Sequence, residues 1–428
     1  MPSLVIEGRA PLSGEIHISG NKNAALPMIA AAMLTSEPVV LHNVPNIIDV
    51  RVMLEVAQAL GADVSFEDGR LEIRAATIRS TDISRELASK IRTSMLFCGP
   101  MLAREPMTVS LWPPGGDVIG RRRLDAHFYG LGGLGVKIEA DTLPFTFTST
   151  GPLTAKELFL DEASVTATEH ILMAAVLARG TTYIRNAACE PHVTDLARLL
   201  NKMGANVTGL DTNTLRIEGV ERLHGAEHTV VEDHVEAASF LALAAATGGE
   251  MTLTGVRRRH YWMTHRIFER FGVNFEMLPG QIHLAGGQEL SIRPDFGNSI
   301  PVVSDGPWPQ FPSDMMSCTI VMATQARGTV LFFEKMFESR IYFVDRLIAM
   351  GANAVVCDPH RVVISGPANL RGITMASPDI RAGMAMVIAA LCAEGTSTIK
   401  NAEVIERGYS NLHEKLLRLG ARVREIPS

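Results

Sequence analysis

The stretch ALGADVSF at residues 59–66 decides the fold, because five later stretches repeat its pattern. Each copy ends an amphipathic helix, passes through a glycine and continues as an alternating strand. The later copies are GLGVKIEA (133–140), KMGANVTG (202–209), RFGVNFEM (270–277), AMGANAVV (349–356) and RLGARVRE (418–425). A glycine just after a helix is typical of its left-handed C-terminal end. Recurrence about every 70 residues predicts six tandem α/β units.

Length and composition predict a soluble protein of two domains. The chain has 428 residues, more than one hydrophobic core usually holds, and six units divide naturally as three plus three. A net charge of -6 argues against a broad nucleic-acid surface or a polybasic membrane surface. The N-terminal apolar run is too short for a signal peptide, and no stretch approaches the roughly 20 apolar residues that span a bilayer. We therefore expect a cytoplasmic protein.

Metal binding and disulfides are not expected from the sequence. The five cysteines are scattered and lie mostly in apolar runs, which is typical of buried thiols. No histidine has a partner at metal-ligand spacing. The glycines of GLGGLG (130–135) match a dinucleotide fingerprint by letter, but there a helix precedes and a strand follows, the reverse of what that fold requires.

Six segments are apolar on every face, which predicts buried inner helices, three to a domain. They span residues 23–35, 93–103, 169–178, 235–246, 315–326 and 382–393. Charges occur only at or before their starts, as Lys22, Arg92, Asp233, Asp314, Asp379 and Arg381. Parallel inner helices would bring these positive dipole ends together. We expect a site for an anionic ligand there.

The charges at the helix starts also allow a structural interpretation. Asp233, Asp314 and Asp379 could each be an ordinary N-cap. Lys22 and Arg92 are different, because a cation at a helix start costs up to roughly 1 kcal/mol. An anion bound between them would remove that conflict.

Two further patterns indicate anion binding. Residues 112–127, WPPGGDVIGRRRLDAH, have the glycines, prolines and arginines of a mobile loop that closes over a negatively charged substrate, although a plain solvated loop is the alternative. Arg340, Arg381 and Arg407 occupy corresponding positions in their repeats. Three arginines in register predict a cluster for phosphate and carboxylate.

Taken together, these motifs resemble the UDP-N-acetylglucosamine enolpyruvyl transferase family. The motifs are GNKNAALP (20–27), PPGGDVIGRRRLDAH (113–127), SVTATEH (164–170), FPSDM (311–315), FESR (337–340), SPDIRAGMAMVIAALCAEGT (377–396) and ERGY (406–409). The resemblance runs from about residue 4 to 425. It implies a two-domain inverse α/β barrel with the active site in the interdomain cleft. Residues 22–231 would form the first domain, and residues 1–21 with 232–428 the second.

The resemblance implies roles for individual residues. Catalytic roles fall on Asp117, Asp314, Lys22 and Arg407. Asp314 would receive the proton of the sugar 3′-hydroxyl, and Arg122 would grip phosphoenolpyruvate. Substrate contacts are implied for Lys22, Asn23, Arg92, Arg122, Arg123, Leu124, Asp125, Ala126, Ser164, Val165, Asp314, Met336, Arg340, Arg381 and Arg407. Among these, Ser164 and Val165 correspond to a diphosphate-binding turn.

The implied reaction needs one acid, one base and several cations. It protonates the methylene carbon of phosphoenolpyruvate, adds the sugar hydroxyl to the neighbouring carbon and expels phosphate. The acid in this family is usually a cysteine in PGGC, whereas this chain has Asp117 in PPGGD. A carboxyl group titrates near 3.9, so nearby substrate anions must raise its pKa. We interpret Asp117 as a variant acid.

Several departures from the family pattern leave the acceptor open. Glu162 stands where the family has a lysine, residues 121–123 read RRR in place of ARP, and His192 replaces a glutamate. The alternatives are an enolpyruvyl transferase for another acceptor, a non-catalytic anion-binding paralogue, or a distant cyclase of similar architecture. The leading interpretation is a monomeric enzyme of peptidoglycan synthesis, and hence of cell shape and division. It would use phosphoenolpyruvate and UDP-N-acetylglucosamine without cofactor, metal, nucleic acid or membrane.

Overall fold

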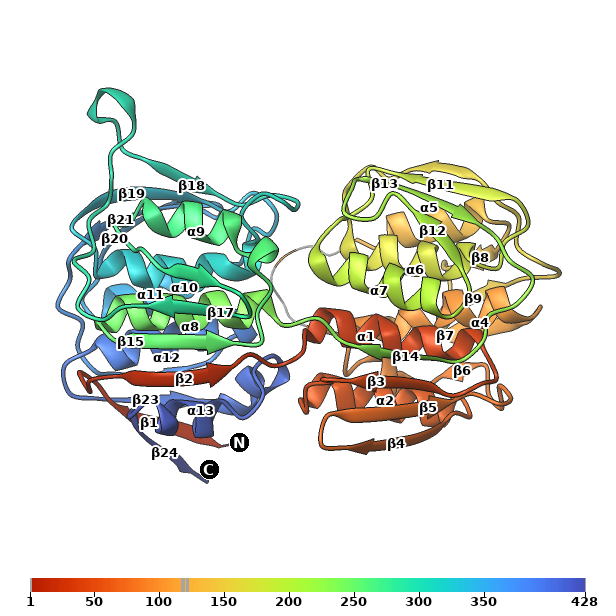
Figure 1. The fold of residues 1–428 in the computed structure, drawn as a ribbon, viewed down its shortest axis with the longest axis horizontal. Helices are drawn as coiled ribbons and strands as arrows, with labels where there is room; N and C mark the ends of the chain where they lie inside the picture. Colours follow the sequence, from red (N-terminus) through yellow and green to blue (C-terminus); the bar gives the residue numbers. More distant parts are fainter. Residues whose placement is uncertain (1, 117–119, 121–122, 428) are drawn as a thin grey trace. The chain divides into compact units, whose positions relative to one another are not determined.

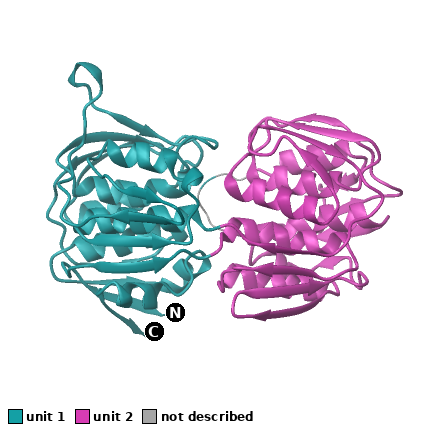
Figure 2. Cartoon of the chain, in the orientation of Figure 1, with its two compact units in different colours: residues 1–19, 117–121, 232–428 teal, residues 20–116, 122–231 magenta. Residues whose placement is uncertain are grey.

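The chain folds into two compact units of similar size. The computed structural model describes residues 2–116, 120 and 123–427. Unit 1 comprises residues 1–19, 117–121 and 232–428, and unit 2 comprises residues 20–116 and 122–231 (Figure 2). The exact domain boundaries inferred above, and the cleft between the domains, stay predictions.

Each sheet has four strands, and the described residues form six such sheets with one shared design. In unit 2 the strand orders are β14(Ala226–Thr229)-β3(Val39–His42)-β5(Arg70–Arg74)-β4(Asp63–Glu67), β6(Asp82–Ile83)-β7(Thr108–Leu111)-β9(Phe145–Thr148)-β8(Lys137–Glu139) and β10(Glu157–Phe159)-β11(Thr181–Arg185)-β13(Thr214–Glu218)-β12(Asn206–Thr208). In unit 1 they are β16(Glu276–Leu278)-β17(Gln281–Leu284)-β15(Glu250–Thr254)-β2(Ser13–His17), β18(Val302–Ser304)-β19(Gly328–Phe333)-β21(Arg361–Gly366)-β20(Asn353–Asp358) and β22(Thr374–Ala376)-β23(Thr396–Lys400)-β1(Ser3–Glu7)-β24(Arg422–Ile426).

Strand pairing within the sheets follows the repeat. In the sheet of β10, for example, β10 runs parallel to β11, β11 antiparallel to β13 and β13 antiparallel to β12. The other sheets have the same sequence of one parallel and two antiparallel pairings. In four sheets an inner helix connects the parallel pair, as α6 (Val165–Ala175) does between β10 and β11, whereas β3 pairs with β14 and β2 with β15 from distant parts of the chain. The predicted six-repeat α/β architecture is confirmed.

The inner helices form the cores of the units (Figure 1). They are α1 (Lys22–Ala31), α4 (Cys98–Arg104) and α6 (Val165–Ala175) in unit 2, and α8 (His234–Thr247), α10 (Ser313–Thr324) and α12 (Ile380–Cys392) in unit 1. Met28, Phe240 and Val387 are fully buried at their centres. Burial on every face is what the uninterrupted apolar runs predicted.

One predicted inner helix is divided in two. Residues 93–103 read as a single apolar helix, but the structure has the 3-10 helix η2 (Arg92–Phe97) followed by α4. Pro100 explains the division, because proline lacks an N–H and clashes with the carbonyl four residues earlier. The α-helix therefore begins at Cys98 and keeps Pro100 in its first turn.

The outer helices end at the repeated glycines, as predicted. They are α2 (Ile48–Ala59), α5 (Asp125–Gly133), α7 (Pro191–Lys202), α9 (Trp262–Glu269), α11 (Val344–Ala349) and α13 (Leu412–Arg418). The glycine after each helix has a φ between 78° and 110°, where only glycine is unstrained. The shorter helices are η1 (Ala32–Leu34), α3 (Arg85–Ala88), η3 (Arg258–His260), η4 (Phe296–Asn298) and η5 (Ala402–Arg407).

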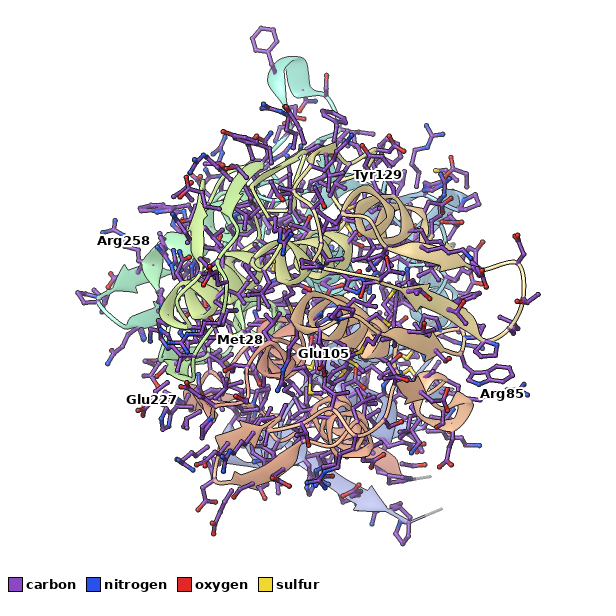
Figure 3. All side chains as sticks on the ribbon, turned by 90° about the vertical axis from the view of Figure 1, so that its right-hand side faces the viewer. Met28, Arg85, Glu105, Tyr129, Glu227 and Arg258 are labelled. Atoms are coloured by element: carbon purple, nitrogen blue, oxygen red, sulfur yellow. The ribbon has the colours of Figure 1, made fainter. Side chains whose placement is uncertain are left out.

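Charged side chains lie on the outer surface of the described residues. Arg85, Glu227 and Arg258 extend outward in Figure 3, whereas Met28 lies within the core of unit 2. Of the helices that the structure describes, none combines the length and the apolar character needed to cross a membrane.

Candidate active site

The carboxylate of Asp314 is the centre of a charged cluster in unit 1. Arg340 Nη2 donates to Asp314 Oδ1 at 2.7 Å, and Arg381 Nε donates to Oδ2 at 3.1 Å. The two arginine side chains are 4–5% exposed, whereas that of Asp314 is 30% exposed. Two guanidinium groups thus meet at one partly exposed carboxylate, and guanidinium groups are favoured partners of phosphate and carboxylate groups.

Asp314 does not act as the N-cap of its helix. Pro312 occupies that position, and Asp314 is the second residue of α10. Asp233 and Asp379, by contrast, do cap their helices, because each accepts two backbone N–H bonds in the first turn. The N-cap interpretation is therefore confirmed for these two residues and wrong for Asp314.

The start of α12 meets the start of α10 through Arg381. Burial opposes the charge of this guanidinium, but Asp314, Tyr409 and Asp233 together hold its pKa above the ordinary value. Arg381 Cζ lies 5.3 Å from the centre of the Tyr409 ring, and Tyr409 Oη is 2.8 Å from Ser239 Oγ in α8. The N-termini of the three inner helices of unit 1 thus converge, as predicted. Convergence of all six inner helices stays a prediction.

A chain of buried hydrogen bonds holds the Arg340 side chain in place. Its Nε donates to Ser313 Oγ at 3.2 Å, and Ser313 donates to Glu334 Oε2 at 2.7 Å. The other oxygen of Glu334 accepts the backbone N–H groups of Met336 and Phe337. Glu334 therefore orients the segment that carries Met336 and Arg340.

Glu334 is protonated more readily than an ordinary glutamate. Burial, and then the neighbouring Asp305, raise its pKa to about 8. Both carboxyl groups are fully buried. Two carboxylates this close cannot both ionise easily, so the pair retains a proton at neutral pH.

Two predicted residues of unit 1 lie at the edge of this cluster. Arg407 ends η5 and is partly exposed, two residues before the buried Tyr409. Met336 is 39% exposed. Both are accessible to a ligand.

Lys22 in unit 2 has a protein partner. Its Nζ lies 2.7 Å from Asp49 Oδ2, and the two side chains are 11% and 4% exposed. Asp49, in the first turn of α2, therefore offsets the unfavourable charge of Lys22 at the start of α1. Sequence reasoning missed Asp49, because an acid in the first turn of a helix is favoured there by the helix dipole alone. Asn23, the next residue of α1, is partly exposed.

A second group of predicted residues gathers where α5 begins. Arg92 Nη2 donates to the carbonyl oxygen of Arg123 at 2.8 Å, and Arg123 makes a two-pronged ion pair with Asp125. Leu124 occupies the N-cap position of α5, and Asp125 is the first helical residue, followed by the partly exposed Ala126. This segment includes the implied uridine-binding residues 123–126.

The implied diphosphate turn starts α6. Ser164 is the N-cap, and its Oγ accepts from Ala167 N at 3.4 Å. Val165 is the first helical residue. His127 Nε2 in α5 lies 3.2 Å from Thr166 Oγ1 in α6, so this turn adjoins the segment of residues 123–126. Asp117 and Arg122 lie outside the described residues, so the roles implied for them stay predictions.

The departures from the family pattern occupy different environments. Glu162 is exposed just before α6, and His192 is buried in the first turn of α7. Among the described residues, no cluster of histidine, cysteine, aspartate or glutamate could hold a metal ion.

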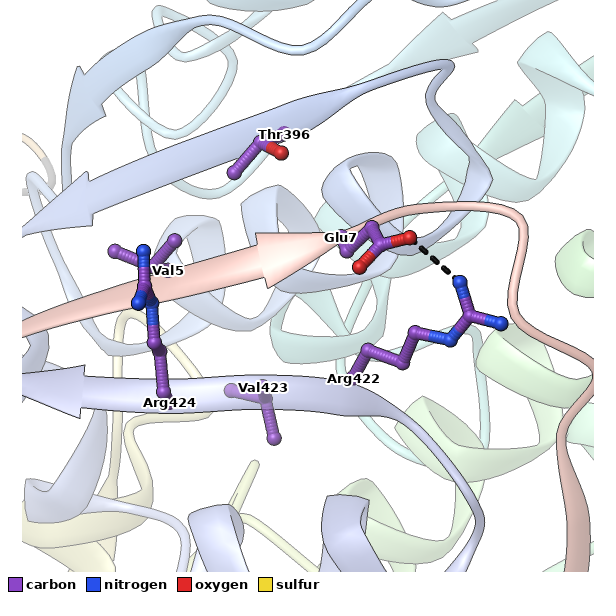
Figure 4. Close-up of a pocket in the computed structure, with 6 residues that line it drawn as sticks. All are labelled: Val5, Glu7, Thr396, Arg422, Val423 and Arg424. Atoms are coloured by element: carbon purple, nitrogen blue, oxygen red, sulfur yellow. Dashed lines mark hydrogen bonds and ion pairs between the residues drawn. The ribbon is translucent and has the colours of Figure 1, made fainter.

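A surface depression elsewhere in unit 1 does not contain these residues. It has a volume of about 450 Å³ and lies on the sheet of β1, β23 and β24 (Figure 4). The lining residues are Val5, Glu7, Thr396, Arg422, Val423 and Arg424. Glu7 pairs with Arg422 across it.

Sequence comparisons reveal relatives along the whole chain. Residues 6–416 match the EPSP synthase (3-phosphoshikimate 1-carboxyvinyltransferase) family. UDP-N-acetylglucosamine 1-carboxyvinyltransferase of Borreliella burgdorferi is 49% identical over 100% of both chains, and that of Treponema denticola is 50% identical over 99% of both. That of Bradyrhizobium diazoefficiens is 50% identical over 99% of this chain and 98% of its own.

The chain belongs to the UDP-N-acetylglucosamine 1-carboxyvinyltransferase family. Two solved structures of other proteins have the same fold as this chain. The enolpyruvyl transferase NikO from Streptomyces tendae has a TM-score of 0.88 at 23% identity, over 100% of this chain and 99% of that one. EPSP synthase from Acinetobacter baumannii has a TM-score of 0.76 at 19% identity, over 100% of both chains. The two-domain inverse α/β barrel is thereby confirmed as the fold class.

Replacing Ser313 with alanine tests the chain behind Arg340. Ser313→Ala leaves buried groups of Arg340 and Glu334 without this partner, so the free energy of unfolding should fall by about 1–3 kcal/mol. Ser317→Ala is the matched control, because Ser317 lies in the same helix and no described residue bonds its buried hydroxyl. Urea unfolding should show a loss for Ser313→Ala alone. Equal effects of the two substitutions would contradict the role of Ser313.

The raised pKa of Glu334 predicts a pH dependence of stability. Because the folded protein holds a proton that the unfolded chain releases above its ordinary pKa of 4.5, stability should fall as pH rises from that value through about 8. Glu334→Gln mimics the protonated carboxyl and should flatten this slope. The melting temperature at several pH values measures it, with the exposed Glu15→Gln as control. A Glu334→Gln slope equal to that of the wild type would refute the assignment.

Proposed function

We propose that the protein transfers the enolpyruvyl group of phosphoenolpyruvate to the 3′-hydroxyl of UDP-N-acetylglucosamine and releases phosphate. The observation that carries this proposal is the Asp314 carboxylate between two buried arginines. Full-length relatives at 49–50% identity bear the name of this activity. The product would enter peptidoglycan synthesis in the cytoplasm, and so serve cell shape and division.

Asp314 supplies the base that the reaction needs. Its partly exposed carboxylate takes the proton of the acceptor hydroxyl, whose oxygen then bonds to C2 of phosphoenolpyruvate. Arg340 and Arg381 hold this carboxylate in position. Proton transfer by a fixed carboxylate typically contributes 10²–10⁴-fold to the rate.

Further cations supply the remaining charge stabilisation. The family resemblance implies that Lys22, Arg381 and Arg407 bind the phosphate and carboxylate of phosphoenolpyruvate, whose charge redistributes as the adduct forms. Asp117 gives a proton to the methylene carbon. When the adduct collapses, a methyl proton returns to a base and the C–O bond to phosphate breaks. Atoms and charges balance without an added oxidant or metal.

The substrate pair is tested by phosphate release from the purified full chain. Phosphoenolpyruvate with UDP-N-acetylglucosamine should give one phosphate per enolpyruvyl product. Shikimate 3-phosphate in place of the nucleotide sugar should give none. Release with shikimate 3-phosphate alone would assign the enzyme to that other acceptor, and no release with either would refute a transferase.

Asp314→Asn should lower turnover by roughly 100-fold or more, because the amide cannot accept the proton. The melting temperature should also fall, because the neutral amide no longer compensates two buried guanidinium groups. Turnover is therefore measured at a temperature where both proteins are folded. Asp345→Asn is the matched control, because Asp345 is an exposed acid in the first turn of α11. Turnover of Asp314→Asn within threefold of the wild type would exclude Asp314 as the base.

The aspartate at position 117 predicts resistance to fosfomycin. In this family the drug's epoxide is opened by the usual cysteine, and a carboxylate is a far weaker nucleophile than a thiolate. The wild type should keep its activity during incubation with drug and nucleotide sugar, and Asp117→Cys should be inactivated with time. Mass spectrometry checks both proteins. A stoichiometric adduct on the wild-type peptide that contains Asp117 would contradict the prediction.

A further inference from the structure

Two buried histidines in unit 2 have no part in the chemistry above. His127 in α5 and His170 in α6 are 1% and 0% exposed, and their Nδ1 atoms lie 3.1 Å apart. Their rings are tilted by 57° with centres 5.3 Å apart. One of two facing ring nitrogens at this distance must donate and the other accept.

The backbone of α4 decides the direction of this hydrogen bond. Gly99 N donates to His170 Nε2 at 2.8 Å, and a backbone N–H can only donate. The proton of the neutral His170 ring is therefore on Nδ1, which donates to His127 Nδ1. Burial lowers the pKa of His170 to about 3, in agreement with a neutral ring.

The proton position on His127 then decides the direction of the hydrogen bond to α6. Because His127 Nδ1 accepts, the proton of its neutral ring is on Nε2, which lies 3.2 Å from Thr166 Oγ1. The chain runs from Gly99 through His170 and His127 to Thr166. Neither ring can become a cation without breaking this chain, because a second ring proton would face another donor.

Thr166 is left with a hydroxyl hydrogen that points away from His127. One lone pair of its oxygen accepts from His127, and no described residue is bonded to this hydroxyl as acceptor. Thr166 is partly exposed and follows Ser164 and Val165, the turn implied to hold a diphosphate. A phosphate oxygen only accepts, so it can pair with the hydroxyl hydrogen that Thr166 has left to donate.

We propose that Thr166 is a specificity-determining donor to a phosphate oxygen of the nucleotide substrate, and that His127 and His170 are positioning residues that fix its hydroxyl. This inference rests on the proposed function. It also offsets a departure from the family, because the family lysine just before this turn is the exposed Glu162 here. The Thr166 hydroxyl, oriented by His127, replaces part of what the missing lysine would contribute to phosphate binding.

Calorimetric titration of the full chain with UDP and with uridine tests Thr166. Thr166→Val keeps the shape but removes the hydroxyl, so the Kd for UDP should rise about 10- to 100-fold, as for a hydrogen bond to a charged group. The Kd for uridine should stay within twofold of the wild type. Thr166→Ser, which keeps the hydroxyl, and the exposed Thr154→Val should bind UDP like the wild type.

Variants of His127 test the chain behind Thr166. His127→Leu should weaken UDP binding as Thr166→Val does, and the double variant should lose no more than either alone. His127→Gln should retain most of the affinity, because its oxygen can accept from His170 and its nitrogen can donate to Thr166. If His127→Leu fails to fold, the glutamine variant alone decides this arm.

Equal UDP affinity of Thr166→Val and wild type would overturn the assignment of Thr166. The same holds if Thr166→Val loses as much affinity for uridine as for UDP. Affinity of His127→Gln as low as that of Thr166→Val would overturn the positioning role. Failure of the proposed function has a different signature, namely no phosphate release by the wild type with phosphoenolpyruvate and UDP-N-acetylglucosamine. The UDP titrations give their answer in either case.

Discussion

The ion pairs of Asp314 with Arg340 and Arg381 impose the strictest constraint on this protein. Buried guanidinium groups need a partner, because an uncompensated charge in the interior costs several kcal/mol. The three residues come from α10, the segment after β19 and the start of α12. Arg340 belongs to the same repeat as Asp314 and Arg381 to the next one, so two repeats must dock correctly before Asp314 has both partners. The tandem architecture brings them together by aligning the starts of the inner helices.

The same constraint is met in a different way in unit 2. Lys22 opposes the dipole of α1, and Asp49 from α2 of the same repeat compensates it. Arg92 donates to a backbone carbonyl, and Arg123 pairs with the exposed Asp125. Unit 1 thus holds Arg340 and Arg381 in its interior. Unit 2 keeps several of its charges near solvent, where a nucleotide can replace water as their partner.

The sequence predicted the fold well because its signals are local. A glycine after a helix and an apolar run of about twelve residues can be recognised without knowledge of their neighbours, and both patterns recur six times. Pro100 divides a predicted helix, and its effect is also local. The prediction was wrong there because it followed the apolar pattern of residues 93–103 and gave the proline too little weight. Local preference misleads at Asp314, where the position favours a cap and the structure places two arginines instead.

Most partners of the site residues could not be predicted in this way. Asp49, Ser313 and Glu334 act on side chains that lie about 20 to 30 residues away in sequence, and His127 and His170 lie 43 residues apart. Which helix faces contact one another depends on tertiary packing. Neither a buried serine nor a histidine in an apolar helix carries a sequence signal for its partner. The roles of the charged residues were accessible only through family resemblance.

Proton NMR of a reaction run in D2O tests most directly that Asp314 and its arginines serve enolpyruvyl transfer. Protonation of the methylene carbon makes a transient methyl group, so solvent deuterium must enter the vinyl position of the product. With phosphoenolpyruvate and UDP-N-acetylglucosamine, the wild type should form an enolpyruvyl sugar nucleotide with diminished vinyl proton signals, and Asp314→Asn should form it at least roughly 100-fold more slowly. A product with undiminished vinyl signals, or no enolpyruvyl product at all, would contradict the mechanism.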